Sequence, residues 1–152
     1  MKPNAVRDKS FAFASRVVKA YKYLQAEQRE YVLSKHLLRS GTSIGANVEE
    51  ALSGASKADF EHKPAISAKE ARETAYWLRL LHENDYLSTP AFDSLHAEST
   101  ELLKILNSIL LTSKHGPHDP NSEFKKSSSV SRFLRPVHQR PPRRGAPGRG
   151  AV

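Results

Sequence analysis

The sequence of 152 residues contains no cysteine, which excludes both a disulfide framework and a thiolate metal site. It has no apolar run long enough to cross a bilayer, and its first sixteen residues lack the apolar stretch of a secretory signal. No segment shows the alternating pattern of a β-strand. These absences predict a soluble, cytoplasmic, all-α protein without a membrane partner, and the length suits a single core.

Positive charge is concentrated at one end of the chain. Residues 1–113 contain 15 Lys and Arg against 14 Asp and Glu, whereas residues 114–152 contain nine against two. The second segment is rich in Pro, Gly and Ser and poor in large apolar residues, so it buries too little surface to offset the entropy lost on ordering. We therefore expect a folded domain over 1–113 and a disordered basic tail over 114–152.

Apolar residues recur at helical spacing in four stretches of the first segment. The stripes are assigned to Phe11, Ala14, Val17, Val18, Tyr21 and Leu24; to Leu33, Leu37, Gly41, Ile44, Val48 and Leu52; to Phe60, Ala68, Ala71, Ala75, Leu78 and Leu81; and to Phe92, Leu95, Leu102, Leu103, Leu106, Ile109 and Leu110. Four helices with short connections predict an antiparallel, up-down-up-down four-helix bundle.

Helix-start signals separate the last two helices from what precedes them. Ser56 and Asp59 form a capping box, and Thr89 followed by Pro90 resembles an N-cap with proline at the first helical position. Pro64 falls inside the third helix and removes one backbone hydrogen bond, so we expect a kink or a weakened start there.

The stretch "RSGTSIGANVEEA", residues 39–51, places Gly41 and Gly45 four residues apart inside the second helix. Each glycine costs about 1 kcal/mol relative to alanine in a helix interior. Close approach of another helix would compensate for this cost. A serine-nucleophile elbow is rejected, because that turn follows a strand and this stretch continues a helix.

Polar residues along the same helix suggest how that approach is held. We expect Ser43 and Asn47 to hydrogen-bond a neighbouring backbone, and Arg39 to pair with Glu50 or with an acid of another chain. A polar ligand site on this face is the alternative. Packing and assembly are favoured, because isolated polar residues on a helix are more often structural.

The third helix carries a second apolar line, formed by Ile66, Trp77 and Leu80, beside its main stripe. One bundle core needs only one stripe, so the second line predicts contact with another subunit. Trp77 is also an aromatic able to stack on a base, although its mid-helix position favours core or interface packing.

Two near-matches to the Glu-x-x-His pattern of metal-binding bundles occur, Asp59-x-x-His62 and Asp93-x-x-His96. Antiparallel neighbours would place these pairs at opposite ends, roughly 30 Å apart by helical rise, so they do not share a metal. The histidines at 115 and 118 are weak evidence for a site. We therefore expect no metal, no cofactor and no enzymatic activity.

The tail combines scattered cations with Pro, Gly and Ser. Its basic residues are Lys125, Lys126, Arg132, Arg135, Arg140, Arg143, Arg144 and Arg149. This composition suits salt-dependent contact with the phosphates of RNA or DNA. A solubilising terminus without a partner is an equally open interpretation.

The segments "YVLSKHLLRSGTSIGANVEEALSGASKADFEHK" and "KEARETAYWLRLL" closely resemble four-helix-bundle proteins encoded in intervening sequences of bacterial 23S rRNA genes. Similar bundles occur as the accessory variability protein of retroelements. The resemblance covers about residues 8–112. It implies a ring-like homopentamer with no known enzymatic activity, and in the retroelement relatives a basic surface that binds nucleic acid and a reverse transcriptase.

Two functions follow from these observations. The first is a pentameric scaffold that binds RNA or DNA weakly and without sequence specificity through the tail and any basic surface of the ring. The second is a protein-interaction adaptor, whose partner docks on the bundle while the tail is passive.

Overall fold

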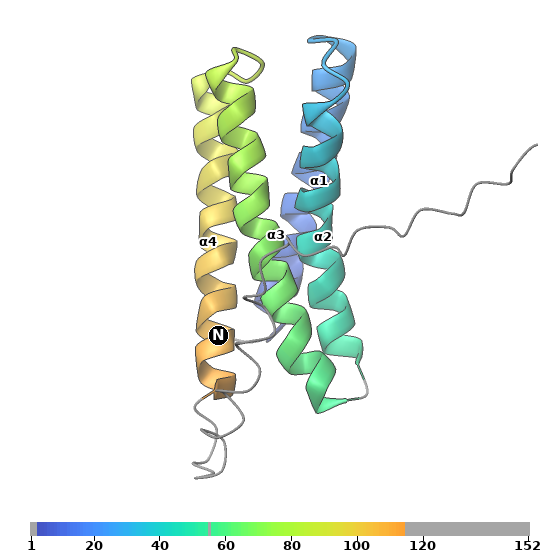
Figure 1. Ribbon diagram of the computed structural model, residues 1–152, viewed down its shortest axis with the longest axis vertical. Helices are drawn as coiled ribbons and strands as arrows, with labels where there is room; N and C mark the ends of the chain where they lie inside the picture. The colour runs from blue at the N-terminus through green and yellow to red at the C-terminus, as the bar shows by residue number, and fades with distance from the viewer. Residues whose placement is uncertain (1–2, 55, 115–152) are drawn as a thin grey trace, which may run out of the picture. The chain divides into compact units, whose positions relative to one another are not determined.

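The computed structural model describes residues 3–54 and 56–114, and the regular structure in these ranges is α-helical. Helix α1 spans Pro3–Ala26, α2 spans Leu33–Ser53, α3 spans Lys57–Glu83 and α4 spans Thr89–Lys114. Successive helices run in opposite directions (Figure 1), so the expected up-down-up-down bundle is confirmed. Within the described ranges, no helix is both long and apolar enough to span a membrane.

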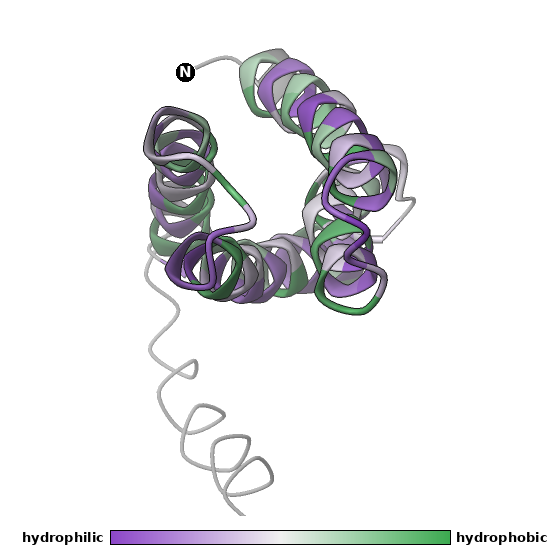
Figure 2. Cartoon of the chain, turned by 90° about the horizontal axis from the view of Figure 1, so that it is seen from above, coloured by the Kyte–Doolittle hydropathy of each residue, from purple (hydrophilic) through white to green (hydrophobic). Residues whose placement is uncertain are grey.

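The four helices follow one another around the bundle in chain order, as the view along its length shows (Figure 2). Each helix packs extensively on its neighbour in sequence, whereas α1 and α4 touch over a much shorter stretch. Ion pairs join these two helices: Arg16 Nη1 lies 2.5 Å from Glu98 Oε1, and Lys9 pairs with Glu101. The side of the bundle between α1 and α4 is therefore its loosest seam.

The start of α3 confirms one predicted cap, and the start of α4 corrects another. Asp59 N donates to Ser56 Oγ at 3.1 Å, as the capping box predicted. In α4, the backbone N–H of Ala91 donates to Ser88 Oγ at 3.4 Å, so Ser88 rather than Thr89 caps the helix. Pro64 is buried within α3, and the helix continues through it without a break, since the ring removes only one backbone bond.

The core register of α1 also differs from the prediction. Phe11, assigned to the core stripe, is 73% exposed, whereas Phe13 is 1% exposed. The buried line of α1 runs through Val6, Phe13 and Val17. Both phenylalanines fit a helical stripe with Val17 in the sequence, and only packing against the neighbouring helices selects Phe13.

Helices α1 and α2 lie close together where α2 has its glycines. A Cβ placed on Gly41 would lie 2.8 Å from both Cγ methyl groups of Val17, which is closer than real Cβ contacts allow. A Cβ on Gly45 would lie 3.3 Å from the carbonyl oxygen of Ser10. The helical stripe therefore passes through the two glycines because α1 occupies the space that their side chains would fill.

Glu30 fixes the start of α2 from the preceding turn. Its carboxylate accepts hydrogen bonds from the backbone N–H groups of Val32 at 3.0 Å, Leu33 at 2.8 Å and Ser34 at 2.6 Å. Burial by itself would raise the pKa of Glu30, but these donors, led by Ser34, outweigh it and hold the pKa below its usual value. The ionised form thus satisfies N–H groups that would otherwise lack partners at the helix start.

We expect Gly41→Ala to destabilise the protein by about 1–2 kcal/mol, because the clash with Val17 exceeds the gain in helix propensity. In a Val17→Ala background the same change should be neutral or stabilising, since the obstructing methyl groups are gone. Urea unfolding of the four proteins in this double-mutant cycle measures the coupling. Equal effects of Gly41→Ala in both backgrounds would show that α1 does not limit the space at this position.

We expect Glu30→Gln to lower the free energy of unfolding near neutral pH by about 1–2 kcal/mol. The folded-state pKa of Glu30 is lowered, so its contribution is present above the pKa of the unfolded chain and is lost as pH falls through the folded pKa. Urea unfolding across the acidic range should therefore show wild type and variant converging. Glu27→Gln, in the same turn but exposed, is the control, and a difference that stays constant with pH would contradict this role.

Candidate functional site

Buried hydroxyl groups join α2 to α3. Ser67 Oγ donates to the backbone carbonyl of Ile44 at 2.6 Å, and the hydroxyls of Thr74 and Ser40 are hydrogen-bonded to each other at 3.0 Å. Ser40, Ser67 and Thr74 are all fully buried. The sequence did not predict that these three hydroxyl groups are buried. The clue was available, because all three occur at core positions of helices whose other stripe residues are apolar.

Charged and aromatic side chains meet at the outer edge of the contact between α2 and α3. We call this group the Arg39 cluster: His36, Arg39, Glu70, Glu73 and Trp77. Arg39 Nη1 lies 3.4 Å from Glu70 Oε1, and Nη2 is hydrogen-bonded to Glu73. Trp77 Nε1 donates to Glu73 at 3.2 Å, and the ring of Trp77 stacks on His36 with centroids 4.5 Å apart. The cluster therefore fastens the outer faces of α2 and α3 together.

The charges in this cluster shift one another's ionisation. The hydrogen bond from Arg39 lowers the pKa of Glu73 most; burial opposes it, and the Trp77 N–H lowers the pKa further. The pKa of Arg39 is raised, chiefly by its hydrogen bond to Glu73. The arrangement stabilises the charged forms of both side chains, as expected of a structural ion pair.

Two predictions about this motif are wrong in detail. Arg39 pairs with acids of α3 rather than with Glu50, whose carboxylate lies 2.5 Å from Lys63 Nζ. Ser43 Oγ and Asn47 Nδ2 donate to carbonyls of their own helix, those of Arg39 and Ser43, at 2.7 and 2.8 Å. Short polar side chains on a helix readily bond the carbonyl four residues back, and here that local bond replaces a contact to a neighbour.

The second apolar line of α3 is half-buried within the single chain. Trp77 packs against the bundle core in addition to stacking on His36, and Ile66 and Leu80 are each partly covered. Contact with α2 thus accounts for part of the burial of Trp77. Its role in contact with another subunit stays a prediction.

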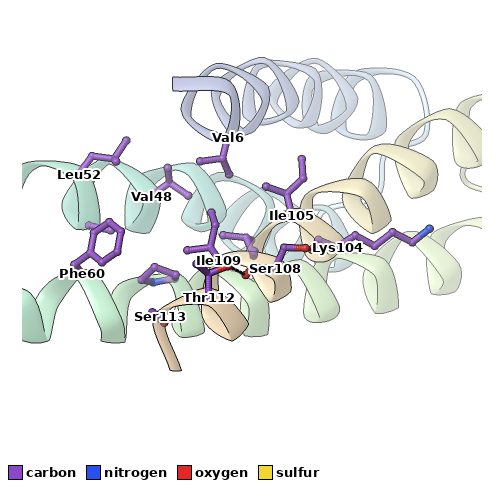
Figure 3. A pocket seen from close by; sticks show the side chains of 13 residues that line it. Val6, Val48, Leu52, Phe60, Lys104, Ile105, Ser108, Ile109, Thr112 and Ser113 are labelled. Atoms are coloured by element: carbon purple, nitrogen blue, oxygen red, sulfur yellow. Dashed lines mark hydrogen bonds between the residues drawn. The ribbon is translucent and has the colours of Figure 1, made fainter. Parts of the chain in front are cut away.

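An apolar groove of about 730 Å³ opens at the end of the bundle where α1 begins and α4 ends. Side chains from all four helices enter it (Figure 3). Val6, Val48 and Ile105 line its inner part, whereas Leu52 and Phe60 are 37% and 45% exposed. Val6 of α1 and Ile105 of α4 place the groove at the end of the loosest seam.

The remaining predicted site residues are separated or lie outside the described part of the chain. Asp59 and His62 lie in the first two turns of α3, and Asp93 and His96 lie near the start of α4 at the other end of the bundle (Figure 1). Within 3–54 and 56–114, no group of three or more His, Asp or Glu residues is arranged to hold a metal ion. The histidines at 115 and 118 and all eight tail cations, from Lys125 to Arg149, lie outside the described residues.

Comparisons with known proteins agree with this bundle. Residues 2–108 match the family described as 23S rRNA-intervening sequence protein. A crystal structure at 1.70 Å of a protein with unknown function from the S23 ribosomal protein family, from Bacteroides thetaiotaomicron VPI-5482, is 52% identical with a TM-score of 0.71. The similarity covers 72% of this chain and 98% of that chain. No match was found among curated proteins.

We expect Arg39→Gln to raise the pKa of Glu73 towards its ordinary value, because the strongest stabiliser of its ionised form is removed. A cycle with Glu73→Gln should give a coupling free energy of about 0.5–1 kcal/mol that falls as salt is added. Carboxyl NMR titration and urea unfolding provide the two measurements. The control is Glu50→Gln, which should leave the Glu73 titration unchanged. A Glu73 pKa that shifts in Glu50→Gln but not in Arg39→Gln would refute the observed pairing.

Proposed function

The chain belongs to the 23S rRNA-intervening sequence protein family, and we propose that it is a non-enzymatic, homo-oligomeric scaffold that binds RNA or DNA without sequence specificity. In this proposal the bundle assembles, as a pentamer, and the tail cations contact phosphates. The tail cations are Lys125, Lys126, Arg132, Arg135, Arg140, Arg143, Arg144 and Arg149. We infer the pentamer and the absence of enzymatic activity from the family resemblance. We infer the nucleic-acid ligand from the distribution of charge along the chain.

The distribution of positive charge supports nucleic acid as the ligand. Ion pairs neutralise many charges of the bundle internally: Arg7–Glu49, Lys9–Glu101, Arg16–Glu98, Arg39–Glu70, Arg39–Glu73, Lys57–Glu61 and Lys63–Glu50. The bundle segment is also nearly neutral overall, whereas residues 114–152 carry nine Lys and Arg against two Asp and Glu. A polyanion is therefore attracted to the tail more strongly than to the bundle as a whole.

Assembly multiplies that attraction. Five tails on one particle would raise the local concentration of cations, so a strand held by one tail is readily bound by the next. The half-exposed apolar side chains Leu52 and Phe60 at the groove support the proposal that the bundle has a protein neighbour, since contiguous apolar surface favours association.

A protein-interaction adaptor is the second candidate, and the same groove favours it. An apolar groove of this size, lined by four helices, suits the apolar face of an amphipathic helix from another protein, such as a reverse transcriptase. In that case the tail is passive. The two candidates differ in whether nucleic acid binds at all. For either function we place the protein in the cytoplasm, consistent with its lack of cysteine.

Replacing all eight tail cations by Gln in the intact chain should reduce RNA and DNA affinity at low salt at least roughly tenfold. The slope of log affinity against log salt should also flatten, by about 0.7 for each single-strand phosphate that a tail cation no longer neutralises. The matched control replaces each arginine of the tail set by Lys. It keeps every positive charge, so it should preserve both the affinity and the salt slope. Fluorescence anisotropy across a salt series makes the measurement; an unaltered slope in the Gln variant would rule out the tail as the binding element.

A further inference from the structure

The outer face of α3 carries exposed cations without an ion-pair partner among the described residues. Lys69, Arg72 and Arg79 are exposed, and none belongs to an ion pair of the bundle. Tyr76, 52% exposed, lies between Arg72 and Arg79 in sequence. At 3.6 residues per turn the four side chains fall within roughly 80° of arc and span roughly 15 Å along the helix. We call these four residues the α3 stripe.

The two acids that lie between the ends of the α3 stripe are at its α2 edge. Glu70 and Glu73 face α2, where Arg39 pairs with both, and their side chains are only 12% and 29% exposed. Glu61, itself paired with Lys57, and Glu83 fall on the same side of α3 as the stripe, about two turns before Lys69 and about one turn after Arg79. The Arg39 cluster therefore has a second effect: by binding Glu70 and Glu73 at the α2 edge, it leaves the outer face of α3 positive between Lys69 and Arg79.

The aromatic member of the stripe is held in place by its neighbour. The rings of Tyr76 and Trp77 meet at 72° with centroids 5.1 Å apart, and Trp77 is in turn stacked on His36. About half of Tyr76 stays open to solvent. An aromatic ring fixed beside cations offers a stacking surface at a small cost in side-chain entropy.

We propose that the α3 stripe binds single-stranded nucleic acid, with Lys69, Arg72 and Arg79 contacting phosphates and Tyr76 stacking on an unpaired base. Cations alone attract any polyanion, whereas an exposed ring adds affinity only for bases that are not already stacked in a duplex. The inference rests on the proposed nucleic-acid function but assigns a contact to the bundle and a preference for single strands. An acidic protein surface is the competing partner.

The test uses the intact chain and two labelled probes, a single-stranded RNA and a duplex of the same sequence. The stripe variant carries Lys69→Gln, Arg72→Gln and Arg79→Gln. Its matched control carries Lys19→Gln, Lys22→Gln and Lys35→Gln, which remove the same charge from exposed lysines that also lack ion pairs among the described residues. Tyr76→Leu keeps an apolar side chain against Trp77 without a stacking ring, and Tyr76→Phe keeps the ring. Thermal unfolding checks that each variant is folded.

The stripe variant should lose single-strand affinity at least roughly tenfold and reduce the salt slope by about 2, whereas the control should change little. Tyr76→Leu should weaken single-strand binding roughly fivefold or more and leave duplex binding unchanged, and Tyr76→Phe should bind normally. Equal losses in the stripe variant and its control would overturn the inference. Displacement of RNA by poly-glutamate with no effect of Tyr76→Leu would assign the face to an acidic protein and would also overturn it.

The tail variant, in which all eight tail cations are replaced by Gln, distinguishes this inference from the proposed function. Loss of binding in the tail variant with normal binding in the stripe variant would overturn the inference and support the tail. The opposite result would support the α3 stripe and reject the tail as the binding element. If the unaltered chain binds neither probe at low salt, both proposals fail.

Discussion

The close approach of α1 to α2 at Gly41 is the constraint on which the rest of the bundle depends. No side chain larger than hydrogen fits at Gly41, because Val17 of α1 occupies the space. With one face of α2 fixed in this way, the adjoining face is turned to α3, where Ser40 bonds Thr74 and the carbonyl of Ile44 accepts from Ser67. Helix α2 thus packs closely against two neighbours. Its glycines let α1 approach, and buried hydroxyl groups hydrogen-bond it to α3.

The loose seam between α1 and α4 contrasts with the close packing around α2. Helices α1 and α4 meet through surface ion pairs, Arg16 with Glu98 and Lys9 with Glu101, and exposed pairs of this kind contribute little stability. The apolar groove lies beyond Lys9, where Val6 and Ile105 are among its lining residues. The fold therefore combines close packing on both sides of α2 with an apolar groove at one end of the bundle.

The number of helices, their direction and their family followed from the sequence, because apolar periodicity and the motif around Gly41 extend over many residues. The register of α1 did not, since Phe11 and Phe13 both fit a stripe and only three-dimensional packing distinguishes them. The partner of Arg39 depends on the rotation of α2 against α3, which periodicity does not specify. From sequence alone, a serine such as Ser67 is expected on the polar surface of its helix. In the structure its hydroxyl donates a hydrogen bond to a helix carbonyl, which allows it to be buried in the core.

Assembly is the step on which the proposed function depends most, because the proposal derives its affinity from several tails acting together on one particle. Sedimentation equilibrium of the intact chain over a wide concentration range tests it most directly. We expect one species close to five times the chain mass of 17.0 kDa. A species of 17.0 kDa at every concentration would contradict a homo-oligomeric scaffold.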